Sequence, residues 1–432
     1  MSSATPPPAP DAPGDVPQVR AGTLVRHAKL WVFPTVLCTL VTLVLALLYM
    51  GGVLNPGDSL HRLPVALVDE DRGRPLPGQQ ENLGKQITDT IAATEAEDDT
   101  VDWRRLDRAE AQEALASGRV YGALVVPEDF TASVAALTTA QAKERPTLSV
   151  LTNPGLGSLG SSMAAQINQG AAHHASLEIG KQLSAAAASA PPTTRVLLTD
   201  PVDVTTRVGH PIGSHSGLGL SAFYYTLLLV LGGFIGGNLV NSAVDTSLGY
   251  ADSELGPWHT RRPTVPINRT QTLVLKMVMT AGIALLTTTL LMVASIAILG
   301  MDASHLPMLW LFSYCATVAV GLGVQAINAA FGGIGQLVSM FVFIALALPS
   351  SGATIPLEAT PAFYRFLGIF EPMHQLSAGV RAILYFDARA DAGLARGWIM
   401  IAVGVVLALA FGFGMTRYYD RRGLHRLTPQ PE

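Results

Sequence analysis

Six long segments of this 432-residue chain carry almost no charge, and they limit most strongly what it can fold into. They lie at residues 30–53, 218–240, 272–299, 308–331, 333–354 and 397–416. Each approaches or exceeds the roughly 20 residues that a helix needs to cross about 30 Å of hydrocarbon. Only 14% of all residues are charged, against about 25% in ordinary soluble proteins. The sequence predicts an α-helical polytopic membrane protein with six transmembrane helices.

Lysine and arginine predict how these helices are oriented. They precede the first apolar segment, occupy the connection 243–270, and follow the last segment, as Arg20, Arg26, Lys29, Arg261, Arg262, Arg269, Arg417, Arg421, Arg422 and Arg426. Cytoplasmic connections are enriched in Lys and Arg, so both termini are expected in the cytoplasm. Residues 1–19, rich in Pro and Ala, are predicted to be a disordered cytoplasmic tail. Residues 20–53 form a juxtamembrane segment and a retained first helix, and 417–432 a basic tail, in a multi-pass protein of the cell membrane.

Residues 54–217 separate the first two apolar segments and are predicted to be a small extracytoplasmic α/β domain. Strand-like runs at 63–68, about 120–126 and 147–152 alternate with helical patterns, which is typical of α/β folds. Asp107 and Glu110 have capping-box spacing, and the helix that they open should stop near Gly118. Residues 158–190 are expected to form a helix or a helical hairpin. The acids Asp69, Glu70 and Asp71 suit a metal site or a strand-ending turn, and the following Arg72-Gly73 favours the turn.

No catalytic motif is present. The closest approach to a phosphate-binding loop, GQQENLGKQ at residues 78–86, is one residue too long and has Gln where Ser or Thr is needed. Two cysteines, Cys38 and Cys315, provide neither a disulfide framework nor a zinc site. A net charge of -4 gives no reason to expect nucleic-acid binding. The chain is not expected to be an enzyme, and no cofactor or metal is expected.

The apolar segments, with these boundaries, contain no Asp, Glu or His. Their one charged residue is Lys276, which is predicted to extend toward the cytoplasmic surface from the start of the third segment. The order of one membrane span, a large outer domain and five more spans also occurs in each half of a proton-driven exporter. Such exporters need ionisable groups within the membrane. The uncharged segments therefore disfavour proton coupling.

Three stretches resemble known membrane proteins. Residues 63–73, LPVALVDEDRG, resemble the strand after the first span in the YhgE/Pip (phage infection protein) family of ABC-2-like membrane proteins. Residues 117–130, SGRVYGALVVPEDF, resemble a second segment of that family. Residues 350–356, SSGATIP, continued by Pro361, 371–373 and Arg381, are similar to the connection before the last span of ABC-2-type permeases. The fungal nitrosoguanidine-resistance membrane proteins share this plan.

The resemblance implies the permease subunit of an ABC-2-type exporter. It would move a hydrophobic or amphiphilic substrate (a lipid, drug or lipid-linked molecule) outward, using a separate ABC ATPase subunit. It would work as a homodimer or heterodimer in membrane lipid. An outer domain limited to residues 54–217 is short for YhgE proteins and favours a compact permease. Two alternatives are a membrane-anchored surface receptor or secretion scaffold, and a proton-driven exporter.

The resemblance and the residue patterns point to several candidate site residues. In the ABC-2 plan the connection at residues 243–270 receives the conformational change of the ATPase. Here this connection contains Asp252, Glu254, Trp258, Arg261 and Arg262. An ordinary cytoplasmic connection would have the same kind of composition. Gly232, Gly233, Gly236 and Gly237 predict close helix packing, within one subunit or at a dimer seam. Gln325 and Asn328 share a helix face and could line a substrate path or bond to a neighbouring helix. The outer segment 355–396 is expected to lie at or dip into the membrane interface.

Overall fold

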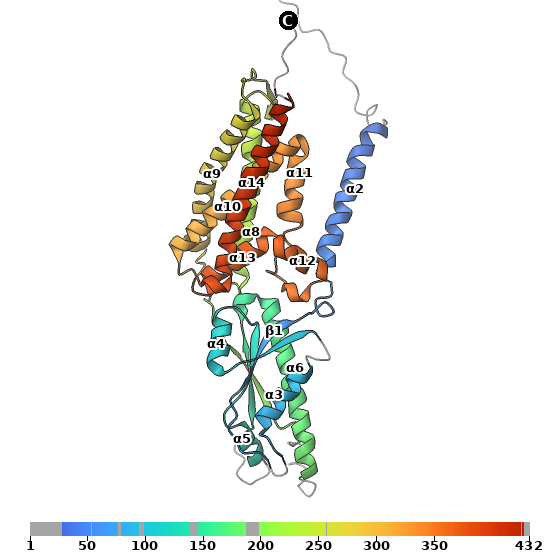
Figure 1. Ribbon diagram of the computed structural model, residues 1–432, viewed down its shortest axis with the longest axis vertical. Coiled ribbons are helices and arrows are strands. Elements are labelled where there is room, and N and C mark those ends of the chain that lie inside the picture. The colour runs from blue at the N-terminus through green and yellow to red at the C-terminus, as the bar shows by residue number, and fades with distance from the viewer. Residues whose placement is uncertain are drawn as a thin grey trace, which may run out of the picture. The chain divides into compact units, whose positions relative to one another are not determined.

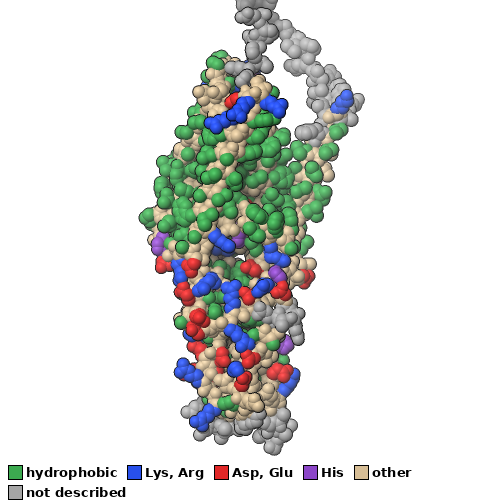
Figure 2. All heavy atoms as spheres, viewed as in Figure 1, with side chains coloured by type: hydrophobic (Ala, Val, Ile, Leu, Met, Phe, Trp, Pro, Cys, Tyr) green, Lys and Arg blue, Asp and Glu red, His purple; other side chains and the backbone are tan. Residues whose placement is uncertain are grey.

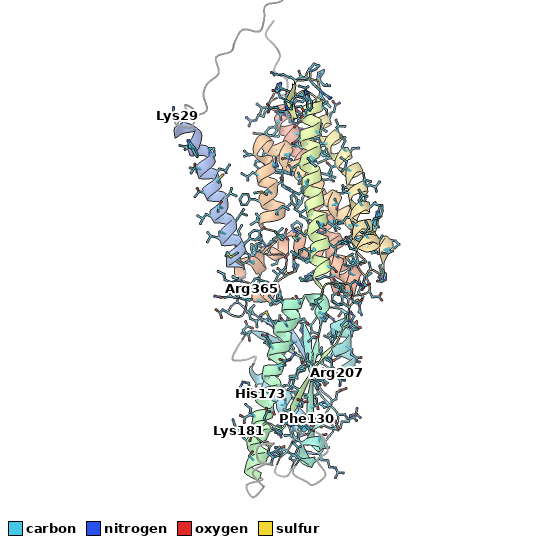
Figure 3. The ribbon with its side chains drawn as sticks, turned by 180° about the vertical axis from the view of Figure 1, so that it is seen from behind. Lys29, Phe130, His173, Lys181, Arg207 and Arg365 are labelled. Atoms are coloured by element: carbon cyan, nitrogen blue, oxygen red, sulfur yellow. The ribbon has the colours of Figure 1, made fainter. Side chains whose placement is uncertain are left out.

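A computed structural model describes residues 28–52, 54–76, 79–94, 99–137, 145–186, 198–255, 257–424 and 426. The predicted tail 1–19 lies outside these residues. Residues 425 and 427–432 of the predicted basic tail 417–432 also lie outside them. The chain divides into two units, Met1–Met50 and Gly51–Glu432. Within the first, helix α2 (Ala28–Gly51) is uncharged except for Lys29 at its N-terminal end (Figure 3). Its segment Pro34–Gly51 is long and apolar enough to cross a membrane.

The second unit contains the predicted α/β domain, built on a five-stranded sheet (Figure 1). The strands, in the spatial order β2-β1-β3-β4-β5, are β1 (Leu63–Asp69), β2 (Val101–Arg105), β3 (Gly122–Val126), β4 (Thr147–Thr152) and β5 (Asp203–Val208). Strand β1 is central to a parallel group with β2 and β3, β4 runs antiparallel to β3, and β5 is parallel to β4. The runs at 63–68, 120–126 and 147–152 thus correspond to β1, β3 and β4. Strands β2 and β5 were not predicted from the sequence.

Helices cover both faces of this sheet. They are α3 (Leu83–Thr94), α4 (Arg108–Ala116), α5 (Phe130–Ala136) and α6 (Ser158–Ala186), with a short 3₁₀ turn, η1 (Pro154–Leu156). On β1, Val65 and Leu67 pack into the larger core with α3 and α6, while Ala66 and Val68 pack on the α4 side. A strand buried on both faces has no polar alternation, which explains the unbroken apolar run of β1. Residues 158–186 form one helix, along which His173 and Lys181 lie (Figure 3).

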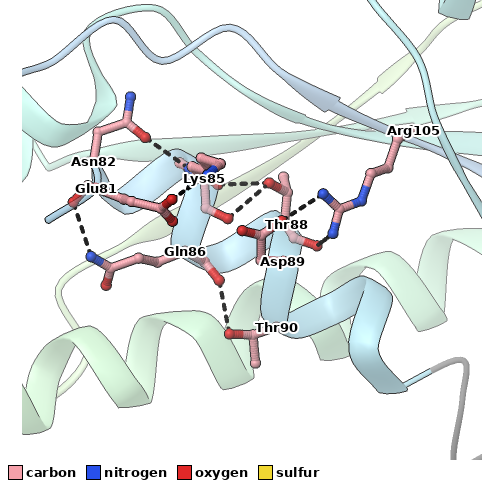
Figure 4. A network of polar contacts seen from close by, with 9 residues as sticks. Glu81, Asn82, Lys85, Gln86, Thr88, Asp89, Thr90 and Arg105 are labelled. Carbon is pink, nitrogen blue, oxygen red and sulfur yellow. Dashed lines mark hydrogen bonds and ion pairs between the residues drawn. The ribbon is translucent and has the colours of Figure 1, made fainter.

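Local signals set the helix ends in this domain. Asp107 caps α4 and forms the predicted capping box with Glu110, and Gly118 follows the helix with a φ of +65°. Helix α3 begins within residues 78–86, the stretch whose sequence is most similar to a phosphate-binding loop. There the Asn82 side chain accepts a hydrogen bond from the Lys85 amide at 2.9 Å, and Lys85 pairs with Glu81 (Figure 4). Asp89 then binds Arg105 of β2 at 2.5 Å, which joins the helix to the sheet edge.

The acidic turn after β1 is a structural junction. The buried Asp71 carboxylate accepts hydrogen bonds from the amides of Gly73 at 2.9 Å, Gly84 at 3.0 Å and Thr131 at 3.2 Å, and from the Thr131 hydroxyl. Glu70 instead pairs with Arg108 on the surface. Among the described residues, no group of three His, Cys, Asp or Glu side chains could hold a metal ion. Asp71 thus closes the turn through Gly73 and also joins it to α3 and α5 through Gly84 and Thr131.

The rest of the unit is a helix bundle around α10 (Leu306–Phe331), which packs against α8 (Leu220–Ser247), α9 (Arg269–Met292) and α14 (Ala395–Arg421). Short π-helical stretches, η2 (Val293–Ile298) and η6 (Ala390–Leu394), extend α9 and precede α14. Hydrophobic side chains cover this bundle, charged ones cover the sheet domain, and Lys and Arg gather at the bundle end far from that domain (Figure 2). With α2, the described chain has five helical stretches long and apolar enough to cross a membrane, the property required of a polytopic membrane protein.

One of those five stretches, Leu306–Ala345, reverses its direction. A 3₁₀ turn, η3 (Gly332–Ile334), separates α10 from α11 (Gly335–Met340) and its π-helical continuation η4 (Phe341–Ala345). Gly332 has φ +59° and ψ -127°. A Cβ on Gly335 would lie against Asn328, and one on Gly323 would lie against Phe343, so α11 and η4 run back along α10 (Figure 1).

The predicted interfacial segment 355–396 divides into parts with different burial. After η5 (Leu357–Ala359), α12 (Ala362–Phe370) exposes four apolar side chains, Phe363, Phe366, Ile369 and Phe370, which suits a membrane interface. Helix α13 (Pro372–Tyr385) instead buries ten residues against the bundle. The apolar side chains of α13 pack on α8 and α14, so only α12 keeps an exposed apolar face of the kind that an interfacial segment needs.

Candidate functional site

A polar cavity of about 480 Å³ lies at the arginine-rich end of the bundle. Its walls come from α8, α9, α10 and α14, and from the residues that follow α14. The polar and charged lining residues are Asn241, Asp245, Arg269, Thr272, Lys276, Gln325, Asn328, Thr416, Tyr419 and Arg426. Its volume falls within the range of about 300–1,000 Å³ that is usual for ligand pockets. A hollow with this lining, within helices apolar enough to span a membrane, is the candidate functional site.

A charge cluster forms one wall of this cavity. Lys276 Nζ lies 2.9 Å from a carboxylate oxygen of Asp245 and 2.6 Å from the Asn241 side-chain oxygen. Arg426 donates to the same Asp245 oxygen at 2.8 Å and lies over the Tyr250 ring. Arg269 donates to the Leu424 carbonyl at 2.7 Å and lies over the Tyr419 ring.

This cluster corrects two sequence-based predictions. Lys276 was expected to extend toward the surface from segments free of acids, but its side chain is only 7% exposed. Helix α8 continues beyond the apolar segment 218–240 to Ser247, which adds Asp245 to a candidate span. The extension is stable because Asn241 and Asp245 lie one turn apart and both bind Lys276.

The predicted pair Gln325 and Asn328 lines the cavity beside this cluster. The Gln325 amide nitrogen donates to the Gly237 carbonyl at 2.8 Å and to the Thr280 hydroxyl at 3.0 Å. The Asn328 amide donates to the Asn238 side chain at 3.0 Å. Both residues thus bond between helices and also line the cavity. The Gln325 side-chain oxygen is buried and has no hydrogen-bond partner among the described residues.

The four glycines of α8 occupy two different faces. A Cβ on Gly233 would lie 2.7 Å from the Thr317 carbonyl oxygen, and one on Gly237 would lie 2.9 Å from Val324, so this pair allows α10 to approach closely. A Cβ on Gly232 or Gly236 would meet no atom within 4 Å. The first pair packs helices within the subunit, while the second faces open space.

The predicted coupling connection forms a β-hairpin rather than an irregular loop. Strands β6 (Ser253–Leu255) and β7 (Trp258–Thr260) pair antiparallel, with Glu254 opposite His259. The Trp258 side chain is 73% exposed. Asp252 lies 3.6 Å from Arg261, and the Arg261 and Arg262 residues are also exposed. The hairpin presents an aromatic ring and cationic groups to the surroundings but lines no part of the cavity.

A second hollow, an apolar groove of about 480 Å³, lies between α10, α14, η4 and the start of α13. Its sides include Val320, Ile327, Phe343, Leu407 and Phe411, and no lining residue is charged. Phe331, which lines the polar cavity, has its ring centroid 6.4 Å from that of Phe411. The groove and the cavity are therefore adjacent, with this aromatic pair between them. The groove was not predicted from the sequence, because it is formed by apolar residues from separate helices.

The stretch that resembles ABC-2-type permeases joins the bundle to the sheet domain. Carbonyls of the loop at 351–353 accept hydrogen bonds from His374 and from the buried Arg381 of α13, the latter at 2.7 Å from Ala353. From the sheet side, the Tyr121 hydroxyl donates to Glu358 at 3.1 Å, and Glu113 pairs with Arg389. These contacts fix the loop between the two parts of the unit.

Glu371 caps α13 within this region, and it is 4% exposed. Its carboxyl group accepts a hydrogen bond from the His374 amide at 3.0 Å. Desolvation by burial nevertheless raises the pKa of Glu371 to about 8, against the opposing effect of the His374 and Met373 amides. The side chain is therefore largely a neutral acid at pH 7.

The raised pKa of Glu371 predicts a pH-dependent stability. The unfolded side chain has lost its proton above pH 4.5, whereas the folded one keeps it until about pH 8, so the free energy of unfolding should fall as the pH rises across this interval. Between pH 7 and pH 9 we expect a loss of roughly 1.5 kcal/mol. Glu371→Gln, which retains the capping oxygen, should remove this component. Denaturant titrations of both proteins at pH 7, 8 and 9 measure it, and parallel pH dependences would contradict it.

The chain matches no curated protein and no solved structure. One family does match, and the matched region includes most of α2, the sheet domain, α8 to α13 and the first part of α14. Its sequence pattern covers residues 34–404, and the chain therefore belongs to the DUF3533 family, whose description is "protein of unknown function".

Proposed function

We propose that this protein is the permease subunit of an ABC-2-type exporter, which moves a hydrophobic or amphiphilic molecule outward across the cell membrane. The observation that carries the proposal is the polar cavity lined by long apolar helices and adjoined by an apolar groove. A helix bundle that only anchors a domain does not need such hollows, since packing is the usual use of buried helix faces. The resemblance of residues 63–73, 117–130 and 350–356 supports the same function.

We propose six membrane crossings with both termini in the cytoplasm and the sheet domain outside. The reversal at Gly332 sends α11 and η4 back along α10, as a separate crossing by the predicted segment 333–354 requires. The cationic end of the bundle, with the cavity and the β6–β7 hairpin, is then cytoplasmic.

The energy is proposed to come from a separate ABC ATPase that binds the cytoplasmic side, where the permease works as a homodimer or heterodimer. The chain has no phosphate-binding loop of its own. The exposed Trp258, with Arg261 and Arg262, gives the hairpin the aromatic and cationic side chains that are enriched in protein interfaces.

The decisive experiment is transport in vesicles that contain this protein and its copurifying ATPase. We expect transport to be lost when the phosphate-binding lysine of the ATPase is changed. Trp258→Ala should reduce ATPase copurification, while Val208→Ala, a change at an exposed position of β5, should not. Transport that continues without an ATPase would overturn the proposal. If a proton gradient drives it, the protein is a proton-driven exporter; if no transport occurs but the sheet domain binds a partner, it is a receptor or scaffold.

A further inference from the structure

The polar cavity carries more positive than negative charge. Three cations line it, Lys276, Arg269 and Arg426, against one lining acid, Asp245. Asp245 already accepts from both Lys276 and Arg426. A further acid of α14, Asp420, does not line the cavity and accepts from the Thr270 hydroxyl at 3.2 Å. Even with Asp420 counted, the cations exceed the acids by one, and a partly buried excess charge attracts an anion more strongly than an exposed one.

The cavity also contains an acceptor that needs a donor. The Gln325 side-chain oxygen is buried without a partner among the described residues, although the amide nitrogen of the same group has two. A buried acceptor left without a hydrogen bond costs about 1–3 kcal/mol.

The apolar groove lies next to the cavity, since Phe331 lines the cavity, Phe411 lines the groove, and the two rings are neighbours. Gly404 of α14 lines it, and a Cβ at Gly404 would meet no atom within 4 Å, so the groove is open at this point. An uncharged groove next to a cationic cavity matches a molecule with an apolar chain and an anionic head.

We propose that the cavity and the groove together bind an anionic amphiphile, with its phosphate or carboxylate beside Arg269 and Arg426 and its alkyl chain along Gly404. Binding itself requires no ATPase. That the amphiphile is the exported substrate, taken from the cytoplasmic side, rests on the proposed function.

The test is equilibrium binding to the full-length protein in a maltoside detergent without nucleotide. The probes are tetradecyl phosphate, tetradecylphosphocholine and inorganic phosphate. We expect tetradecyl phosphate to bind at least tenfold more tightly than either of the others. Arg269→Gln and Arg426→Gln should each weaken its binding at least fivefold, whereas Arg417→Gln, an exposed arginine of α14 that does not line the cavity, should change it less than twofold.

Glycine variants test the groove separately. Gly404→Leu should fill it and weaken binding of tetradecyl phosphate at least tenfold, while Gly414→Leu, at an open position of the same helix outside the groove, should not. Unfolding temperatures confirm that each variant is folded. Equal binding of both amphiphiles would overturn the anionic head group, and equal binding of inorganic phosphate and tetradecyl phosphate would overturn the chain site. Neither outcome bears on whether an ATPase drives transport, so the two proposals fail separately.

Discussion

Asp71→Ala is expected to destabilise the sheet domain by about 3–5 kcal/mol, the largest effect predicted for a single side chain of this domain. The carboxylate accepts from the amides of Gly73, Gly84 and Thr131 and from the Thr131 hydroxyl. These donors come from the turn after β1, the start of α3 and the start of α5. Alanine leaves them buried without an acceptor and releases three segments from one another.

Hydrogen exchange of the full-length protein, followed by mass spectrometry, measures this effect where it occurs. Peptides from the end of β1, the start of α3 and the start of α5 should lose protection in Asp71→Ala. Asp71→Asn, which keeps one carbonyl oxygen, should lose less. The neighbouring Glu70→Ala removes only a surface ion pair with Arg108 and should cost less than about 1 kcal/mol. If the Asp71→Ala and Glu70→Ala proteins show the same amide hydrogen exchange, the structural role of Asp71 is refuted.

Asp245→Ala is expected to lower the free energy of unfolding of the helix bundle by about 3 kcal/mol, because it leaves the buried Lys276 ammonium without its counterion. Lys276→Met should cost less, since Asp245 keeps its bond to Arg426, which can turn toward solvent. Asp245→Ala combined with Lys276→Met should recover most of the loss. Removing both members of a buried ion pair is often nearly neutral, whereas removing one is costly.

Unfolding of the single and double variants in detergent gives the coupling energy of the pair. Asp252→Ala serves as the control, because this acid makes only exposed contacts with Arg261 and His259. Its effect should be within about 0.5 kcal/mol. A double variant as unstable as Asp245→Ala would show that Asp245 contributes mainly through Arg426 or Asn241 and not through Lys276.

Sequence patterns predicted the elements whose physical cause is local. The apolar run of β1, the capping box of Asp107 and Glu110, and the stop at Gly118 could all be identified, because each depends on neighbouring residues. Strands β2 and β5 were missed because their formation does not depend on neighbouring residues in the sequence. Their sequences, VDWRR and DVTTRV, are short, polar edge strands without an apolar pattern, and pairing with β1 and β4 makes them strands.

The residues of the candidate site also differ in whether the sequence could predict them. Gln325 and Asn328 were noticed because two amides in an apolar helix are unusual. Asp245 was assigned to a connection, because the apolar pattern ends at residue 240 and a window of hydropathy cannot detect a helix continued by contacts with another helix. The groove could not be predicted, since its lining residues are ordinary apolar side chains.

By itself, the sequence determined that this chain has helices apolar enough to cross a membrane and an α/β domain between the first two of them. Transfer of apolar residues from water depends on composition along the chain, and so it can be read residue by residue. Only the tertiary structure decided where charge and empty space meet. The pairing of Asp245 with Lys276 and Arg426, the reversal at Gly332 and the meeting of a cationic cavity with an apolar groove are long-range contacts, whose energies depend on distances that no local pattern specifies.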